Sequence, residues 1–323
     1  MQHTSVGKTG EKTVRKTTGK LLPVVIVLGV IHRMADAQFL GPQQINQLPS
    51  SPADHRVHYG SGPLQFGDLR LPQTAGRHPV AVVIHGGCWK SRHGDLMADL
   101  QNTAALSSAL TSFGIATWNI EYRCIDNPGG GWPGTFADVA HALDYMRVLA
   151  QAYPLDVSRV VIIGHSAGGH LGTWAAARHR LPQHCPLFSQ EPLRVAGVVN
   201  LAGLADLERF LPMQSEVCGE PVITHLLGGS PSEVPERYRQ ASPSHLLPIR
   251  VQQVFIPGAQ DNVVPPWFGQ QYAEEAKKVG DDVSFVVVDN ASHFEVIAPG
   301  SVAWPQVEQA VLSMMKLQKG TSK

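Results

Sequence analysis

Ser166 is the residue of this sequence best placed for nucleophilic chemistry. It lies at the centre of the pentapeptide GHSAG (residues 164–168), directly after the β-branched run VVII (residues 160–163) and before a segment with helical periodicity. A strand–turn–helix context exposes a serine hydroxyl on a strained turn, and glycine on either side avoids a clash with the neighbouring backbone. The pattern predicts Ser166 as a nucleophile. A glycine-rich turn with a helix-capping serine is the alternative interpretation.

His293 and Asp261 are the predicted base and orienting acid, because a serine hydroxyl needs a positioned base near neutral pH. Of the 15 histidines, His293 follows the last predicted strand. In a parallel sheet, its loop lies at the same edge as Ser166. Asp261 ends the preceding strand, whereas the rivals Asp289 and Glu295 lie too close to His293 in sequence. The alternatives are an exposed loop histidine and a turn aspartate.

Backbone N–H groups are expected to stabilise the oxyanion of an acyl-transfer transition state. The predicted donors are Ala167, directly after the nucleophile, and Gly86 and Gly87, which follow a strand of the buried type. His85 precedes these glycines and is expected to brace their loop, not to act as the base.

Aromatic side chains near these loops are candidates for the walls of a substrate pocket. Trp89 and Trp132 are predicted to be substrate-binding residues, with ordinary packing as the alternative. His165 and His170 flank the nucleophile in sequence and are expected to point into the turn or the helix.

Strands that alternate with helices are expected to position these residues. The predicted strands are residues 57–59, 64–71, 79–84, 116–122, 160–163, 195–201, 251–257 and 283–288. The predicted helices are residues 96–113, 136–152, a segment from about residue 170, 266–279 and 306–317, with Thr135 and Asp138 capping the second. The alternation predicts an α/β fold with a mostly parallel central sheet, helices on both faces and an antiparallel strand pair at one edge.

One large domain over residues 56–317 is predicted, because 323 residues suffice for a single α/β core. Residues 205–247 are predicted to be an irregular segment that forms a short inserted cap, with prolines that include Pro212, Pro221, Pro231 and Pro235.

The composition argues against several classes of protein. The 26 basic and 26 acidic residues balance, so no nucleic-acid partner is predicted. The sequence has no C-x-x-C pair and no H-E-x-x-H motif, so no metal site is predicted. No cofactor and no particular oligomeric state are predicted.

Residues 1–37 are organised like a secretory signal peptide. A basic start precedes an apolar run over residues 21–31 and an Ala-x-Ala site that ends at Ala37. The run is too short to span a bilayer comfortably. A secreted or periplasmic protein is therefore expected. Translation that starts at Met34 would remove the signal and leave the protein in the cytoplasm.

Six stretches together resemble the α/β-hydrolase fold family over about residues 56–317. They are IHGGCW (84–89), NIEYR (119–123), GGGWPGTFADV (129–139), GHSAGGHLG (164–172), PGAQDNVVP (257–265) and ASHFEVI (291–297). Within the family, the chain is similar to the esterase/lipase branch related to hormone-sensitive lipase, which includes acetyl esterases and kynurenine-formamidase-like enzymes. The resemblance implies Ser166, Asp261 and His293 as nucleophile, acid and base. One departure is Cys88, which stands where such formamidases usually have tyrosine.

The four cysteines allow none, one or two disulfides. Cys185 and Cys218 bracket the predicted cap, and Cys88 and Cys124 follow strands that lie side by side in the resembled fold. These two pairs are therefore the predicted disulfides.

The leading functional prediction is a serine carboxylesterase that cleaves short-chain acyl esters, acetyl to butyryl, through an acyl-enzyme. Its expected partner is a small-molecule ester. An arylformamidase-like amidase is the main alternative, since it uses the same triad. A serine peptidase and a non-catalytic binding protein on the same fold are weaker alternatives.

Overall fold

The computed structural model describes residues 39–317, so the predicted signal peptide lies outside the described residues. Within this range, no helix has the length and apolar character needed to cross a membrane. The packed unit begins upstream of the predicted residue 56. A short helix, α1 (Pro42–Asn46), buries Ile45 in the core.

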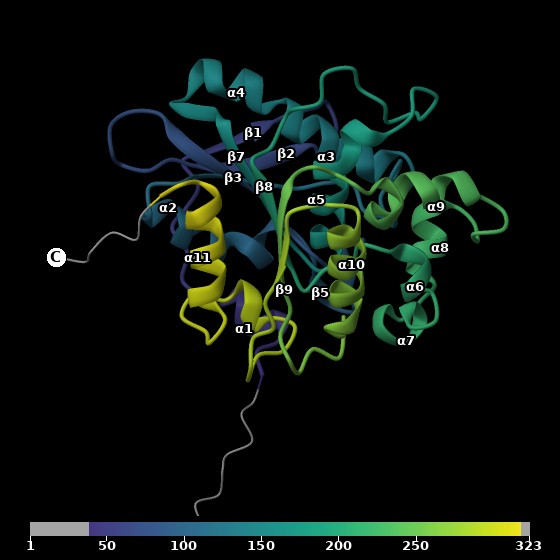
Figure 1. Cartoon of the computed structure of the whole chain (residues 1–323). Coiled ribbons are helices and arrows are strands. Elements are labelled where there is room, and N and C mark those ends of the chain that lie inside the picture. The colour runs from purple at the N-terminus through teal and green to yellow at the C-terminus, as the bar shows by residue number, and fades with distance from the viewer. Residues whose placement is uncertain (1–38, 318–323) are drawn as a thin grey trace, which may run out of the picture. The chain divides into compact units, whose positions relative to one another are not determined.

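The main sheet has eight strands in the spatial order β1-β2-β6-β3-β7-β8-β9-β10 (Figure 1). Neighbours from β6 to β10 are parallel, whereas β2 is antiparallel to both β1 and β6. The predicted fold class, with its antiparallel pair at one edge, is thus confirmed. The strand bounds are β1 His55–His58, β2 Phe66–Arg70, β3 His78–Ile84, β6 Ala116–Ile120, β7 Leu155–His165, β8 Gly197–Leu201, β9 Gln252–Ile256 and β10 Val283–Phe285.

Helices cover both faces of this sheet (Figure 1). On one face lie α3 (Gly134–Asp144), α4 (Met146–Ala152), α5 (Ala167–Ala177) and α10 (Trp267–Lys278), and on the other lie α1, α2 (Ala104–Ser112) and α11 (Trp304–Met314).

The central strands are apolar on both sides. In β3, Val80, Val82 and Ile84 pack into the core with α3, α4 and α5, whereas Ala81 and Val83 pack into the core with α2 and α11. All five side chains are fully buried. A strand that is covered on both faces has a continuous run of apolar residues in its sequence, and this run is why β3 could be predicted from the sequence.

One predicted helix start is wrong. The segment from residue 96 begins with β5 (Leu96–Met97), which pairs with β4 (Arg92–His93), and continues as the 3₁₀-helix η1 (Leu100–Thr103) before α2. The side chain of Asp99 accepts a hydrogen bond from the Gln101 N–H and so starts η1.

The predicted capping pair at Thr135 and Asp138 is also wrong. Helix α3 already begins at Gly134, and the Thr135 hydroxyl donates to the Arg123 carbonyl. Asp138 forms a two-pronged ion pair with the Arg123 guanidinium. Both side chains therefore fix the loop after β6 instead of capping a helix.

The segment between β8 and β9 is helical and not irregular. It lies on the α5 and α10 side of the sheet (Figure 1). Its elements are α6 (Leu207–Phe210), α7 (Gln214–Cys218), α8 (Val222–Leu227), α9 (Pro235–Ala241) and the 3₁₀-helix η3 (Pro243–Leu246). We call residues 205–247 the cap segment below.

The disulfide pairing differs from both predicted pairs. Cys88, after β3, is bonded to Cys218 at the end of α7, with the two Cα atoms 6.0 Å apart. Cys124 and Cys185 are buried free thiols. Cys124 packs in the main core beside Tyr122, and Cys185 lies against the backbone of Leu187.

The helix that follows Ser166 is anchored to the cap segment by two ring donors. His170 Nε2 donates to the Ala241 carbonyl at 3.0 Å, and Trp174 Nε1 donates to the Gln240 carbonyl at 2.9 Å. His170 therefore does not point into its own helix, as expected, but bridges to α9. Burial lowers the pKa of His170 to about 4.

This buried histidine predicts a pH-dependent stability. The unfolded chain takes up a proton near pH 6.5, whereas folded His170 takes it up only near pH 4, so stability falls as the pH drops through this window. The effect should reach about 2 kcal/mol between pH 7 and pH 5. Chemical denaturation of the parent and of His170→Gln, which keeps a donor for Ala241, would measure it.

The exposed His245 provides the control. His245→Gln should retain the parent's loss of stability, whereas His170→Gln should lose less on acidification. An equal loss in His170→Gln and the parent would show that this group does not carry the effect.

Candidate active site

Ser166 occupies a strained turn between β7 and α5. Its backbone has φ 52° and ψ −119°, a region that non-glycine residues rarely adopt. The flanking positions require glycine, because a side chain there would overlap the neighbouring backbone. A Cβ on Gly164 would lie 2.1 Å from the Gly168 carbonyl oxygen, and one on Gly168 would lie 2.2 Å from the Ile84 carbonyl oxygen. The Ser166 N–H is held by the Leu201 carbonyl at 2.9 Å.

His293 and Asp261 are joined by a buried hydrogen bond. His293 Nδ1 lies 2.8 Å from Asp261 Oδ2, and both side chains are nearly inaccessible to solvent. The other carboxylate oxygen of Asp261 accepts the N–H groups of Val263 and Val264, both at 2.9 Å. With Nδ1–H donated to Asp261, the neutral ring has its basic nitrogen at Nε2.

The two loops that carry this pair are tied together by backbone hydrogen bonds. The Ala259 N–H donates to the Val288 carbonyl, and the Gln260 N–H donates to the Ala291 carbonyl, both at 2.9 Å. Of the sequence rivals, Asp289 is exposed, and Glu295 accepts the Ser292 N–H within its own loop. Neither rival replaces Asp261 as the partner of His293.

Ser166 and His293 line the same cavity. No hydrogen bond joins the Ser166 hydroxyl to the His293 ring among the contacts of residues 39–317. Such contacts are often long before a substrate binds.

His165 supports the loop that carries His293. Its Nε2 donates to the His293 carbonyl at 3.0 Å, and the two rings lie 4.7 Å apart. Burial, and then the proximity of His293, hold the pKa of His165 well below its ordinary value. His165 therefore stays neutral and, contrary to the expectation, contacts the neighbouring loop instead of its own turn.

The glycine pair after β3 approaches Ser166 closely. A Cβ on Gly86 would lie 2.9 Å from both the Ser166 Cβ and the His165 carbonyl oxygen, and Gly87 has φ 110°. The N–H groups of Gly86 and Gly87 find no acceptor within the described range. Ala167 is the first residue of α5, so its N–H also lacks an intrahelical partner.

His85 braces this loop, as predicted, through a partner that the sequence analysis did not single out. His85 Nε2 lies 3.0 Å from Glu121 Oε1, and its Nδ1 donates to the Gly86 carbonyl at 2.8 Å. Burial alone would lower the pKa of His85, but the Glu121 carboxylate outweighs it and raises the pKa. The Tyr122 hydroxyl donates to the His85 carbonyl at 2.9 Å and completes the brace.

Glu121 and Tyr122 are functional-site residues that reasoning from chemistry missed. Their signal was the stretch NIEYR (residues 119–123), which was noticed only as part of the family resemblance. Glu121 Oε1 also accepts the Tyr122 N–H, and its Oε2 accepts the Leu100 N–H. The carboxylate thus connects β6, η1 and the glycine loop.

Two cavities of very different size meet at Ser166. The larger has a volume of about 250 Å³, and the smaller has about 10 Å³. Trp89 lines the smaller one. Trp132 lines neither: its ring packs edge-on against Phe136 of α3, and its backbone N–H donates to the Leu226 carbonyl. The structure thus places this ring in packing against α3 and not in the walls of these two cavities, and its predicted role in substrate binding stays a prediction.

No group of three or more potential metal ligands occurs in residues 39–317. The site offers acid–base and nucleophilic chemistry through Ser166, His293 and Asp261, with N–H donors beside the serine.

Comparison with known proteins gives sequence relatives that are named as esterases. Esterase LipC of Mycobacterium tuberculosis is 26% identical over 277 residues, which cover 82% of this chain and 65% of the relative. Probable carboxylic ester hydrolase LipM of the same organism is 28% identical over 66% of this chain and 47% of the relative. The chain thus spans about half to two thirds of the length of these relatives.

Solved structures share the fold. A truncated carbohydrate esterase from gut microbiota superimposes with a TM-score of 0.68 at 22% identity and covers 83% of this chain and 97% of its own. Native esterase 2 of Thermogutta terrifontis gives a TM-score of 0.62 at 20% identity over 84% of this chain and 92% of its own. The fold is therefore the α/β-hydrolase fold. The BD-FAE family model matches residues 68–275, more than half of the sequence, and the chain belongs to that family.

Proposed function

We propose that this protein is a serine carboxylesterase that cleaves short-chain acyl esters through an acyl-enzyme intermediate. The observation that carries the proposal is the buried Asp261–His293 pair, which reaches the same cavity as Ser166 on its strained turn. The esterase names of the relatives LipC and LipM support the same reaction class.

In the proposed reaction, His293 Nε2 takes the proton of the Ser166 hydroxyl as its oxygen attacks the ester carbonyl carbon. The carbonyl oxygen becomes an oxyanion, for which the N–H groups of Gly86, Gly87 and Ala167 are the donors. The intermediate collapses as His293 returns the proton to the leaving alcohol. Water then attacks the acyl-enzyme by the same route and releases the acid.

Asp261 is a positioning residue in this scheme. Its carboxylate holds the Nδ1–H of His293 and stabilises the imidazolium that forms during attack. Because Val263 and Val264 fix the other oxygen, the carboxylate cannot rotate away without losing two hydrogen bonds.

The first prediction for this function concerns the triad. Ser166→Ala should lower kcat by about four orders of magnitude or more, because the triad acts as a unit. Asp261→Asn should lower kcat by about 10⁴, because the amide no longer stabilises the imidazolium. Rates on p-nitrophenyl acetate and labelling by a fluorophosphonate would measure both.

Asp289→Asn is the matched control, since it makes the same chemical change at an exposed carboxylate that neighbours His293 in sequence. It should stay within about twofold of the parent, as surface substitutions usually do. Activity of Ser166→Ala within tenfold of the parent would refute the assignment of the nucleophile.

The second prediction concerns the substrate. An amide nitrogen must be protonated as it departs, whereas an ester has a better leaving group. We expect p-nitrophenyl acetate to give the highest kcat/KM of three substrates, about a hundredfold or more above p-nitrophenyl palmitate. If N-formylkynurenine, the third substrate, is turned over best, the amidase alternative replaces the esterase.

We also propose that the protein is exported. The Cys88–Cys218 disulfide supports this, because structural disulfides persist in oxidising compartments. The signal-like organisation of residues 1–37 supports it as well. Mass spectrometry of the protein made in its host should find an N-terminus at Gln38 and an intact disulfide. An uncleaved chain with four free thiols would contradict export.

A further inference from the structure

The two cavities at Ser166 share one boundary. Four residues line both of them: Cys88, Ser166, Val217 and Val263. A carbonyl carbon bonded to the Ser166 hydroxyl oxygen therefore sits where the cavities meet. Its two substituents, the acyl chain and the leaving group, must point to different sides.

The position of His293 decides which side takes which group. His293 lines the large cavity and is absent from the walls of the small one. Under the proposed function, the leaving oxygen receives its proton from His293, so the leaving group must lie in the large cavity. The acyl chain is left with the small cavity, whose wall includes Ala167.

The small cavity sets a strict limit on the acyl chain. Its volume of about 10 Å³ is close to the space of one water molecule, which a methyl group fills. The walls are apolar and tightly packed, with Trp89, Leu204 and Phe210 each buried. A cavity of this size leaves little room for an acyl chain longer than acetyl unless the wall moves.

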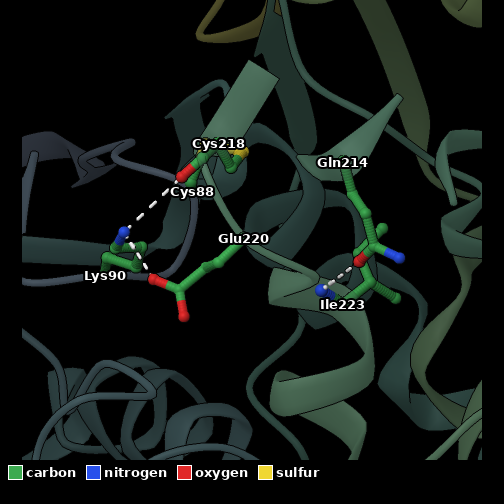
Figure 2. The surroundings of a disulfide bond; sticks show 6 residues. All are labelled: Cys88, Lys90, Gln214, Cys218, Glu220 and Ile223. Carbon is green, nitrogen blue, oxygen red and sulfur yellow. Dashed lines mark hydrogen bonds and ion pairs between the residues drawn. A yellow bond between two sulfur atoms is a disulfide. The ribbon is translucent and has the colours of Figure 1, made fainter. Parts of the chain in front are cut away.

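The wall is held in place by the disulfide. Cys88 directly follows the glycine pair, and Cys218 ends α7, next to the boundary residue Val217. A second contact acts in parallel: Lys90 Nζ forms an ion pair with Glu220 Oε1 at 2.5 Å and lies 3.5 Å from the Cys218 carbonyl (Figure 2).

Helix α7 is also attached to α8. It contains five residues, and the Gln214 side chain accepts the Ile223 N–H at 2.8 Å and so links it to α8 (Figure 2). Because the helix is too short to be stable by itself, the covalent link to the glycine loop keeps Val217 at the boundary.

We propose that the Cys88–Cys218 disulfide is the specificity-determining element of this enzyme: it fixes α7 against the glycine loop and so restricts the acyl side to acetyl. The proposal rests on the proposed esterase function. Without the bond, α7 moves away from Ser166, the small cavity widens, and longer acyl chains enter.

The test compares kcat/KM for p-nitrophenyl acetate and p-nitrophenyl butyrate, which share a leaving group. The Cys88→Ala/Cys218→Ala double variant should shift the butyrate-to-acetate ratio toward butyrate by about tenfold or more, since excluding one or two methylenes is worth at least that factor. The ratio of 4-methylumbelliferyl acetate to p-nitrophenyl acetate should change far less, because the leaving group lies on the other side.

The chain offers a matched control in its two free thiols. Cys124→Ala/Cys185→Ala also removes two buried sulfurs, but neither thiol lines a cavity at Ser166, so both ratios should stay at the parent values. If the disulfide variant does not fold, Val217→Ala keeps the bond and trims the boundary directly. It should shift the acyl ratio in the same direction.

An unchanged acyl ratio in the folded disulfide variant, or in Val217→Ala if the disulfide variant does not fold, would overturn the proposal. A change confined to the leaving-group ratio would overturn it as well. Fluorophosphonate labelling of Ser166 in each variant separates this result from failure of the proposed function. Labelled but unshifted variants reject only the role of the disulfide, whereas a parent that is not labelled rejects the esterase.

Discussion

The active-site geometry depends on one packing constraint, which is the close approach of two neighbouring strand ends. In the parallel pair β3–β7, Ile84 lies opposite Gly164, so both strands end at the same level of the sheet. The chain after β7 then turns under the carbonyls of β3, and a Cβ on Gly168 would overlap the Ile84 oxygen. The turn therefore requires glycine at positions 164 and 168. This turn brings Ser166 beside Gly86.

Three buried histidines with different partners lie at this edge of the sheet. His85 has the Glu121 carboxylate, which raises its pKa, and both of its nitrogens donate. The hydrogen-bond partner of His165 is the His293 carbonyl, and burial, followed by the proximity of His293, lowers its pKa and keeps it neutral. His293 is the ring placed for proton transfer, because it lines the cavity of Ser166 and its Nδ1 is held by Asp261.

The fold and the central residues could be predicted because they depend on local pattern. The buried strands, the glycine-flanked Ser166 and the loops of Asp261 and His293 each have a signal within about ten residues. The disulfide could not be predicted in the same way, because Cys88 and Cys218 are 130 residues apart and meet only through the packing of the cap segment. Glu121 was missed for a similar reason, since a carboxylate after a strand shows its role only when His85 is placed beside it.

The residues that match the family and the residues that line the two cavities overlap only in part. Ser166 and Asp261 lie within the stretch that matches the family, residues 68–275. The large cavity is completed by residues from outside that stretch, Pro42 on α1 and Phe294 after the base. The small cavity, by contrast, is closed by a bond between two cysteines within it. Changes in these walls can alter which ester fits without disturbing the strand ends that hold the serine, because neither wall contributes to the β3–β7 register.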